Sequence, residues 1–395
     1  MSIDLINKYL LSFLVLSLIF LGFYLCFIGG YGSDEDTLPM IGAFEARLAD
    51  GTFVSSRFTS YPIPEIGIGF LSHFFGSFAA NSVTFFFNIL GLFFIYFTFQ
   101  EKLSFQRLNL FLILSLTSPI LFFENLEPMD YSWAFLFFSL GCFFFSKKIF
   151  ELAILGFGFA IGCRINFIIF IIFFIYFYKL DENLSLKKKS LIFLNTFIVG
   201  GLFYLPIWYD NSFGLNWITA ARPIDQGFFG LIARFGYKSI MTFGLIQLIL
   251  ILYFLIKIKI SKNSDLKLLT ILTISNFCLF LYIPAEKSYL QPAIIFLNLI
   301  LIDKFNKNIV SLIIVLNFVS WFISYDFLKI QHKDNSVCAP KHAINASFQF
   351  TFSQGALYDF YDSRKNIACW VNANTIRGKR ILEGKSTRVI KKNVK

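Results

Sequence analysis

The sequence predicts an all-α polytopic membrane protein with about eleven transmembrane helices, on three observations. Hydrophobic residues make up 56% of the 395 residues, charged residues make up 15%, and 56 residues are phenylalanine. The apolar residues recur in runs along most of the chain, and a soluble domain has no core large enough to bury them all. Lysine and arginine gather in alternate segments between these runs, which is the pattern that membrane topology produces.

The apolar runs fit the length of a membrane helix. A bilayer core about 30 Å thick requires roughly 20 mostly apolar residues per helix, since in lipid each backbone polar group must be satisfied within its own helix. No small-residue cleavage signal follows the first run, so we expect it to be a retained span. The expected spans lie near residues 9 to 29, 82 to 99, 108 to 123, 131 to 146, 150 to 163, 165 to 179, 189 to 207, 238 to 256, 267 to 283, 289 to 303 and 308 to 324.

Two of these spans are short because Arg164 lies between them. An arginine at the centre of a bilayer costs at least about 2.5 to 3.5 kcal/mol. A helical hairpin that turns at Arg164 avoids this cost. A single long helix over residues 150 to 179 is the alternative.

The orientation follows from the loops, because positively charged loops are retained in the cytoplasm. Five loop segments hold fourteen Lys and Arg residues, whereas the opposite loops hold five, together with twelve acidic residues. We therefore expect a cytoplasmic N-terminus, a working face outside the cytoplasm and a location in the plasma or inner membrane. The basic segments are residues 100–107, 146–150, 179–189, 257–267 and 303–307.

The chain divides into a transmembrane domain over residues 1–324 and a polar C-terminal segment over residues 325–395. The segment holds thirteen Lys and Arg against five Asp and Glu, a net charge of +8. After eleven spans it lies outside, where its basicity suits anionic lipid headgroups or surface glycans and not nucleic acid. Its two cysteines, Cys338 and Cys369, fit a disulfide in an oxidising compartment. The alternative is that the two fall in one polar segment by coincidence.

Motifs of soluble enzymes are missing from the sequence. It contains no phosphate-binding G-x-x-x-x-G-K-[ST] loop, no G-x-G-x-x-G, no H-E-x-x-H and no C-x-x-C. The three histidines, His73, His332 and His342, are not at ligand spacing, so a metal site built on histidine is not expected. We expect no cofactor, and a divalent metal bound by carboxylates alone stays open.

The first outer loop, residues 30 to 81, carries the most distinctive polar pattern. Asp34, Glu35 and Asp36 follow the first span directly, which is typical either of a solvated turn or of a functional acidic motif. The proline-rich stretch from Tyr61 to Glu65 then introduces an apolar segment over residues 66 to 80. We expect that segment to be a helix lying against the outer membrane surface, because counting it as a span would reverse every later loop.

The order of motifs resembles that of the GT-C class of integral-membrane glycosyltransferases, which includes protein O-mannosyltransferases and bacterial aminoarabinose transferases. The resemblance covers roughly residues 1 to 305 and rests on five motifs. These are an acidic motif after the first span, a proline-led helix, a second outer loop with carboxylates, a glycine-rich half-span ending in a basic residue, and a late Tyr-Leu-x-Pro turn. In this sequence they are Asp34 to Asp36, Tyr61 to Glu65, Glu124 to Tyr131, Gly156 to Arg164, and Glu286 to Pro292. The late motif has one proline where the class has two.

The resemblance implies transfer of a sugar from a polyisoprenyl-phosphate donor to a lipid- or protein-linked acceptor at the outer face. A carboxylate removes the acceptor proton, and basic residues at headgroup depth stabilise the departing phosphate. The first choice for the base is Asp34 and the second is Asp36, while Glu127 and Asp130 orient the acceptor or support a metal. The expected phosphate ligands are Lys287, Arg57, Arg164 and Arg222, although snorkelling anchors are the alternative for Arg164 and Arg222. The expected substrate-loop residues are Glu35, Tyr61, Glu65, Glu286 and Tyr289.

Two rival functions use the same broad architecture. A lipid-linked glycan polymerase or ligase also acts outside the membrane, but its large loop is expected late in the chain. A polytopic transporter is expected to show two similar halves with charged or helix-breaking residues in mid-span, and the sequence shows no internal repeat.

Overall fold

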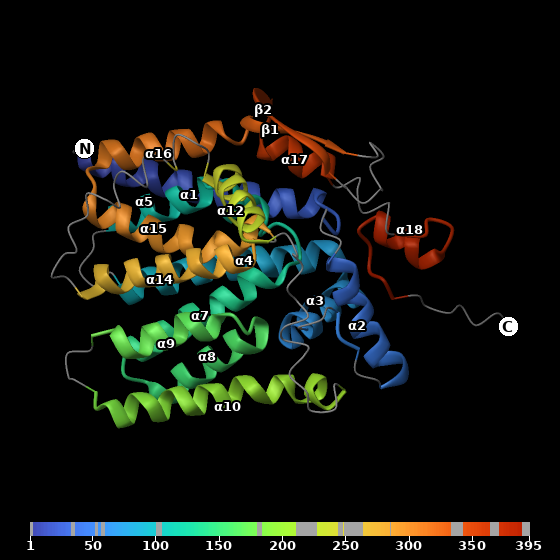
Figure 1. Ribbon diagram of the computed structural model, residues 1–395, viewed down its shortest axis with the longest axis horizontal. Coiled ribbons are helices and arrows are strands. Elements are labelled where there is room, and N and C mark those ends of the chain that lie inside the picture. Colours follow the sequence, from blue (N-terminus) through green and yellow to red (C-terminus); the bar gives the residue numbers. More distant parts are fainter. Residues whose placement is uncertain are drawn as a thin grey trace.

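The computed structural model is a bundle of long helices with a small C-terminal appendage (Figure 1). The part of the chain that it describes contains sixteen α-helices and one antiparallel pair of strands. The helical fold class is thus confirmed for the body of the chain. The pair of strands was not predicted. The structure describes residues 3–32, 36–51, 54–56, 60–99, 105–179, 184–210, 227–243, 248, 264–284, 286–332, 343–363 and 371–388.

The long helices lie side by side with nearly parallel axes, as helices that cross a membrane do (Figure 1). In this array α4 packs on α7, α7 on α8 and α8 on α10, while α14 packs on both α9 and α15. A further helix, α12 (Gly227–Phe243), packs on α14. The array consists of α1 (Ile3–Ile28), α4 (Ser77–Phe99), α5 (Phe105–Thr117), α7 (Asp130–Ser146), α8 (Phe150–Cys163), α9 (Phe167–Phe177), α10 (Leu186–Asp210), α14 (Ser264–Tyr282), α15 (Gln291–Lys304) and α16 (Lys307–Val319).

Four helices of the described chain are long and apolar enough to cross a membrane: Tyr9–Ile28, Ser77–Phe99, Leu186–Tyr209 and Asp265–Tyr282. These lengths indicate an integral membrane protein. Several other expected spans are shorter helices, and most of the expected span from 238 to 256 lies outside the described residues. The count of eleven spans therefore stays a prediction. The shorter apolar helices are Phe105–Thr117, Phe150–Cys163, Phe167–Phe177 and Lys307–Val319.

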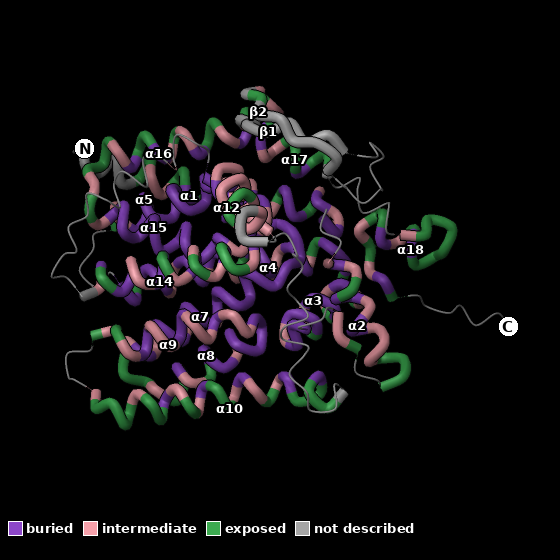
Figure 2. The backbone as a smooth tube through the Cα atoms, in the orientation of Figure 1, coloured by how far each residue is buried: buried purple, intermediate pink, exposed green. Residues whose placement is uncertain are grey.

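Burial separates an inner set of helices from an outer set (Figure 2). The inner helices α5, α7 and α15 are buried along most of their lengths. Their phenylalanine rings pack together, and the ring centroids of Phe138 in α7 and Phe296 in α15 lie 6.3 Å apart. By contrast α10, at one edge of the array, exposes a row of large apolar side chains. An apolar outer surface on a helical array is what lipid, and not water, stabilises. The exposed row consists of Leu191, Leu194, Phe197, Ile198 and Leu202.

Several expected spans differ at their ends from the observed helices, among them the span from 308 to 324, since α16 ends at Val319. Helix α4 begins at Ser77, five residues before the expected start. The expected span from 108 to 123 is interrupted at Ser118, because Pro119 has no N–H to continue α5 and instead starts the short helix α6 (Pro119–Phe123). The expected span from 289 to 303 is preceded by the 3-10 helix η1 (Lys287–Leu290), and Pro292 lies in the first turn of α15.

The chain turns back at Arg164, as the hairpin interpretation predicts. Arg164 has extended φ and ψ angles of −152° and 116°, and this ends α8 at Cys163. The next helix begins at Phe167, and the rings of Phe157 in α8 and Phe174 in α9 lie 6.0 Å apart. Such a contact requires the two helices to run side by side, so the single long helix is excluded.

The first loop forms two helices, α2 (Thr37–Asp50) and α3 (Pro62–Phe75), at one end of the array (Figure 1). They pack closely because Gly69 lies against Phe44, where a Cβ would come within 2.2 Å of the phenylalanine Cβ. The predicted helix over 66 to 80 is thus present, but it ends earlier, at Phe75. Gly76 breaks it with a φ of 89°, which favours glycine.

The strands β1 (Ile323–His332) and β2 (Ala343–Gln354) pair antiparallel with a bulge between Asp326 and Leu328, and β1 begins two residues before the expected start of the C-terminal segment. Helices α17 (Ala356–Ser363) and α18 (Ile376–Leu382) follow. The start of β1 could not be predicted from the sequence, because its first residues continue the apolar run of α16 and lie within the last expected span.

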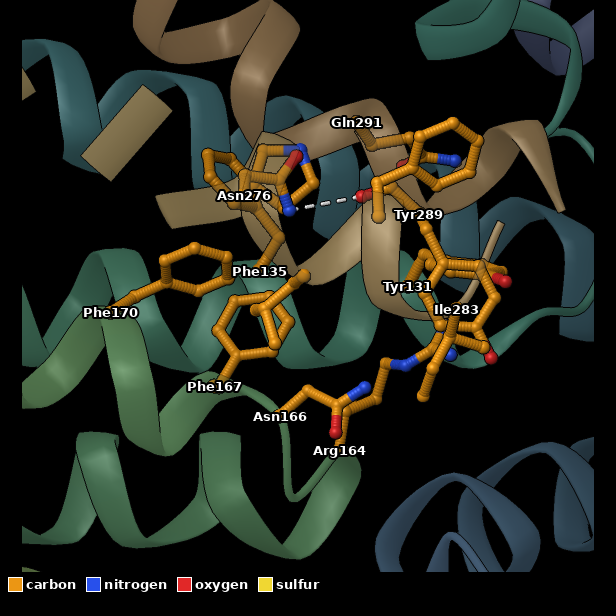
Figure 3. Close-up of a pocket in the computed structure, with 13 residues that line it drawn as sticks. Tyr131, Phe135, Arg164, Asn166, Phe167, Phe170, Asn276, Ile283, Tyr289 and Gln291 are labelled. Carbon is orange, nitrogen blue, oxygen red and sulfur yellow. Dashed lines mark hydrogen bonds between the residues drawn. The ribbon is translucent and has the colours of Figure 1, made fainter. Parts of the chain in front are cut away.

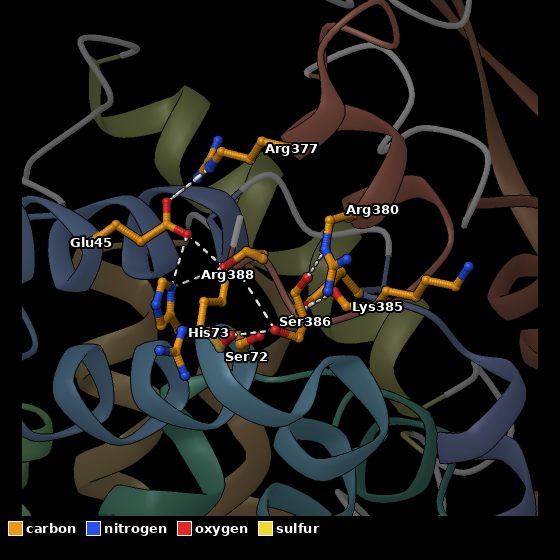
Figure 4. Close-up of polar contacts among 10 residues, drawn as sticks. Glu45, Ser72, His73, Arg377, Arg380, Lys385, Ser386 and Arg388 are labelled. Carbon is orange, nitrogen blue, oxygen red and sulfur yellow. Dashed lines mark hydrogen bonds and ion pairs between the residues drawn. The ribbon is translucent and has the colours of Figure 1, made fainter. Parts of the chain in front are cut away.

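The end of this segment packs on α3, where α3 gives way to α4 (Figure 4). The backbone nitrogen of Thr387 donates to the carbonyl oxygen of Ser72 at 3.2 Å, and Ser77 N donates to Gly384 O at 3.0 Å. Glu45 of α2 accepts a hydrogen bond from Arg377 at 2.8 Å. These contacts place residues 371–388 at the same end of the array as α2 and α3.

Candidate functional site

A buried ion pair joins Asp130 and Arg164 at the loop end of the array. Asp130 is the first residue of α7, and Arg164 follows the last residue of α8. Arg164 Nη1 lies 3.1 Å from Asp130 Oδ2, and the side chains are 4% and 0% exposed, respectively. A charge this far from water requires its partner, because removal of either one leaves the other uncompensated. The interpretation of Arg164 as a snorkelling anchor is therefore wrong, since an anchor reaches water or headgroups.

Three tyrosine rings surround the Arg164 guanidinium. Its Cζ lies 3.9 Å from the ring centroid of Tyr131, 4.6 Å from that of Tyr289 and 5.2 Å from that of Tyr61. All three distances are within the range of cation–π attraction, about 6 Å. The rings come from α7, η1 and the residue before α3, so the second outer loop, the late motif and the first outer loop converge on one cation. The sequence had placed Tyr61 and Tyr289 at the site, and the structure brings them together.

The protein leaves part of this centre without hydrogen bonds. Among the described residues, Nη1 and Nη2 of Arg164 and both carboxylate oxygens of Asp130 have no partner of good hydrogen-bond geometry. The 3.1 Å contact between them is thus electrostatic, without an aligned hydrogen bond. Since nearly all buried polar groups in proteins are hydrogen-bonded, these atoms require a partner from outside the described residues, which is either ordered water or a ligand.

Two further carboxylates lie beside the centre. The hydroxyl of Tyr131 donates to Glu286 Oε2 at 2.5 Å, and Ser288 Oγ donates to Glu124 Oε2 at 2.9 Å. Lys287 Nζ lies 3.4 Å from Glu124 Oε1, and its side chain is 42% exposed. The Glu124 carboxylate raises the pKa of Lys287, so the ammonium stays charged at neutral pH. Lys287 is therefore near the site, as predicted, but it already has an anionic partner.

A small, partly open pocket lies next to Arg164 (Figure 3). Its polar groups are Arg164, Tyr131, Tyr289 and the amides of Asn166, Asn276 and Gln291, whereas the rest of its lining is apolar. Figure 3 shows Phe167 and Phe170 on the side of the pocket away from Tyr131 and Tyr289. A cation at one side and aromatic rings at the other suit an amphiphilic anion. The apolar lining consists of Phe135, Phe167, Phe170, Leu279, Phe280, Ile283 and Pro292.

The two outer loops meet beside this centre. A Cβ on Gly32 would lie 2.5 Å from the side-chain carboxyl carbon of Glu127, so the Glu127 side chain rests on the backbone of Gly32. Thr37, the first residue of α2, lies with its hydroxyl 3.9 Å from the sulfur of Met129. The residues on either side of the acidic motif, Gly32 and Thr37, therefore contact the second loop. Asp36, at the N-cap of α2, makes no side-chain capping bond.

Glu65 has a structural role. Its side chain is fully buried, and Arg47 Nη2 lies 2.8 Å from its Oε2. Its Oε1 accepts hydrogen bonds from the backbone nitrogens of Ser56 and Tyr61 at 3.0 Å, and from the hydroxyls of Ser56 and Ser60 at 2.6 and 2.8 Å. Glu65 is fully buried and all of these bonds are to groups of its own loop and of α2. Glu65 therefore fixes the loop that positions Tyr61, and its assignment to a substrate loop stays a prediction.

Several predicted site residues lie outside the described residues: Asp34, Glu35, Arg57 and Arg222. The same holds for Cys338 and Cys369, so their pairing stays a prediction. Within the described ranges, no three His, Cys, Asp or Glu side chains gather closely enough to hold a metal ion. His73 lies 3.4 Å from both Glu45 and Thr387, which places it in the contact with the C-terminal segment.

Sequence reasoning missed three residues of the site as functional candidates: Glu124, Tyr131 and Gln291. The first two were visible as part of the carboxylate-rich second loop, but only folding shows that Tyr131 contacts Arg164. Gln291 carried a weaker signal, as the variable residue before Pro292. No known protein family matches this chain, and neither a curated protein nor a solved structure is significantly similar to it. The geometry of the site therefore carries the functional inference.

Proposed function

We propose that the chain is a membrane glycosyltransferase that moves a sugar from a polyisoprenyl-phosphate donor to a lipid- or protein-linked acceptor outside the cytoplasm. The observation that carries the proposal is the unsatisfied guanidinium of Arg164 at the edge of a largely apolar pocket. A phosphate group supplies acceptors for the Nη1 and Nη2 donors of Arg164, which Asp130 leaves without aligned hydrogen bonds, and a hydrocarbon chain suits the phenylalanines beside it.

The reaction needs a base for the acceptor and a cation for the leaving group. A carboxylate takes the proton from the acceptor hydroxyl while the acceptor oxygen forms a bond to the anomeric carbon. The bond between that carbon and the phosphate oxygen breaks, and its electron pair leaves on the lipid phosphate, facing Arg164. Asp130 holds Arg164 in place and is fully buried, which suits a positioning residue and not the base.

The first loop supplies the base in this proposal, with Asp34 as first choice and Asp36 as second. The contact between Gly32 and Glu127 supports this assignment, because Gly32 precedes the acidic motif by two residues. Lys287 assists at the phosphate, alternating between Glu124 and the donor. Glu286 holds the Tyr131 hydroxyl and through it the ring that covers Arg164.

The membrane topology belongs to the same proposal: eleven spans, a cytoplasmic N-terminus, and the first loop and C-terminal segment outside. The charge count supports it. So does the packing of residues 371–388 on α3, since an even number of crossings must separate two segments on the same side. Helix α3 lies at the outer membrane surface in this arrangement, because Ile66, Phe70 and Phe74 form an exposed apolar stripe on it.

The test is carried out in cells that lack the chain. We expect them to accumulate the glycosylated lipid phosphate and to lose one sugar from a surface glycan, both measured by mass spectrometry. The wild-type chain restores the sugar, and Asp34→Asn, which keeps the shape and removes the base, slows transfer by about 10² or more. An unchanged lipid pool and unchanged glycans would refute the function. Full activity of both Asp34→Asn and Asp36→Asn would remove the first loop from the chemistry.

A further inference from the structure

We infer that Gln291 is a second headgroup contact in the pocket beside Arg164, donating a hydrogen bond from its Nε2 to an oxygen of the lipid-linked sugar phosphate. The inference rests on the proposed function, because it concerns the same site and the same donor. It assigns a role to the variable residue of the late motif, which is not among the site residues expected from the sequence.

Gln291 is a buried amide with an unused donor. It is the first residue of α15, it is 4% exposed, and its Nε2 has no hydrogen-bond partner among the described residues. It lines the pocket together with Arg164, which reaches that pocket from the turn between α8 and α9 (Figure 3). Burying an amide without a hydrogen bond costs roughly 1 to 3 kcal/mol, so the free donor is a cost that a bound ligand removes.

The start of α15 does not need this amide. Asn276 of α14 serves that helix end, because its Oδ1 accepts from the backbone nitrogen of Ala293 at 3.2 Å and its Nδ2 donates to the carbonyl oxygen of Tyr289 at 3.1 Å. Pro292 has no N–H to satisfy. Asn276 and Gln291 thus line the same pocket. The amide of Asn276 is hydrogen-bonded to the backbone, whereas Nε2 of Gln291 has no partner among the described residues.

The chemistry of the pocket defines the ligand class. Two Nη atoms of Arg164 and Nε2 of Gln291 are donors without hydrogen-bond acceptors, and the phenylalanines suit an apolar chain. A phosphorylated isoprenoid supplies both the acceptors and the chain. The acceptor for Gln291 is either a phosphoryl oxygen or a sugar oxygen. A binding assay distinguishes them, because only the glycosylated lipid carries sugar oxygens.

The experiment measures equilibrium binding of farnesol, farnesyl phosphate and farnesyl phosphoryl-glucose to the purified full chain in nanodiscs. Gln291→Met keeps the shape of the side chain and removes both amide atoms. The matched control is Asn298→Leu, which removes another buried amide of α15, one that donates to Ser115 Oγ at 3.2 Å outside the pocket. Melting temperatures confirm that each variant is folded.

We expect Gln291→Met to bind the phosphorylated ligands about tenfold more weakly, with farnesol unchanged and Asn298→Leu equal to wild type. A loss for both phosphorylated ligands assigns the contact to the phosphate, and a loss for the glycosylated ligand alone assigns it to the sugar. Equal binding by Gln291→Met and wild type, or an equal loss for farnesol, overturns the role of Gln291 and leaves the proposed function standing. If wild type itself binds farnesol as tightly as both phosphorylated ligands, the proposed function fails and this inference with it.

Discussion

The guanidinium of Arg164 lies 3.1 Å from the carboxylate of Asp130, and neither side chain reaches solvent. The pair ties the end of α8 to the start of α7, two helices that pack along their length. It also sets the position of Arg164 beneath the tyrosine rings. The buried pair is thus both a structural tie and the support for the cation of the site.

The first prediction concerns the stability of this pair. Asp130→Asn leaves the Arg164 charge buried without compensation, so we expect the free energy of unfolding to fall by about 3 to 5 kcal/mol. The combined replacement Asp130→Leu with Arg164→Met removes both charges and should cost less than the single change. Titration with denaturing detergent measures both values. A double variant that is as unstable as Asp130→Asn would show that the pair is not a buried charge couple.

The second prediction concerns Glu65 as the anchor of the first loop. Glu65→Gln replaces one acceptor oxygen by an NH₂ group. That donor then faces another donor, either Arg47 or the groups around Tyr61, so hydrogen bonds that hold the loop are lost. Hydrogen exchange at the amides of Ser56 and Tyr61 should then become faster. Glu383→Gln, at an exposed pair with Lys385, is the matched control and should leave that exchange unchanged. Unaltered protection in Glu65→Gln would contradict the anchoring role.

The third prediction concerns Lys287 at the late motif. Because its ammonium is half exposed and faces Glu124, loss of that ion pair alone should change stability by less than about 1 kcal/mol. If Lys287 also contacts the donor phosphate, Lys287→Ala should weaken donor binding and slow transfer, a loss of roughly 1.5 to 3 kcal/mol. The measurement is transfer rate against donor concentration, normalised to folded protein. Glu124→Gln is the comparison, since it removes the ion pair and keeps the ammonium. Unchanged kinetics in Lys287→Ala would remove Lys287 from the site.

The fourth prediction concerns topology. Asp50 ends α2 and Lys188 lies near the start of α10, and these two positions are at opposite ends of the array (Figure 1). A cysteine at position 50, made by Asp50→Cys, should react with an impermeant maleimide in intact cells, whereas Lys188→Cys should react only after the membrane is opened. Equal labelling of both positions in intact cells would refute the orientation and the outer site with it.

The helical body could be predicted from the sequence because its signal is local. Apolar length indicated the helices, and the cost of a charge in lipid indicated the turn at Arg164. The ends of α4, α5 and α15 were less predictable, since they depend on single residues such as Pro119. The strand pair could not be predicted, because its apolar residues continue directly from those of α16.

The site was predictable in part of its membership and not in its roles. Tyr61, Asp130, Arg164 and Tyr289 were all candidates, and folding brings them into one cluster. Their roles depend on distances in space, which the spacing of residues along the sequence does not give. The sequence could not show that the Glu65 carboxylate accepts several hydrogen bonds, or that the Nη atoms of Arg164 have no hydrogen-bond acceptor.

The central claim is that Arg164 binds a lipid phosphate in the pocket beside it. The most direct test compares the affinities of farnesyl phosphate and farnesol for wild type and for the charge-neutral double variant of Asp130→Leu with Arg164→Met. We expect wild type to prefer the phosphate by about 10-fold to 100-fold, as one charge-assisted contact provides, and the double variant to bind both ligands alike. A preference for the phosphate that survives in the folded double variant would contradict the claim.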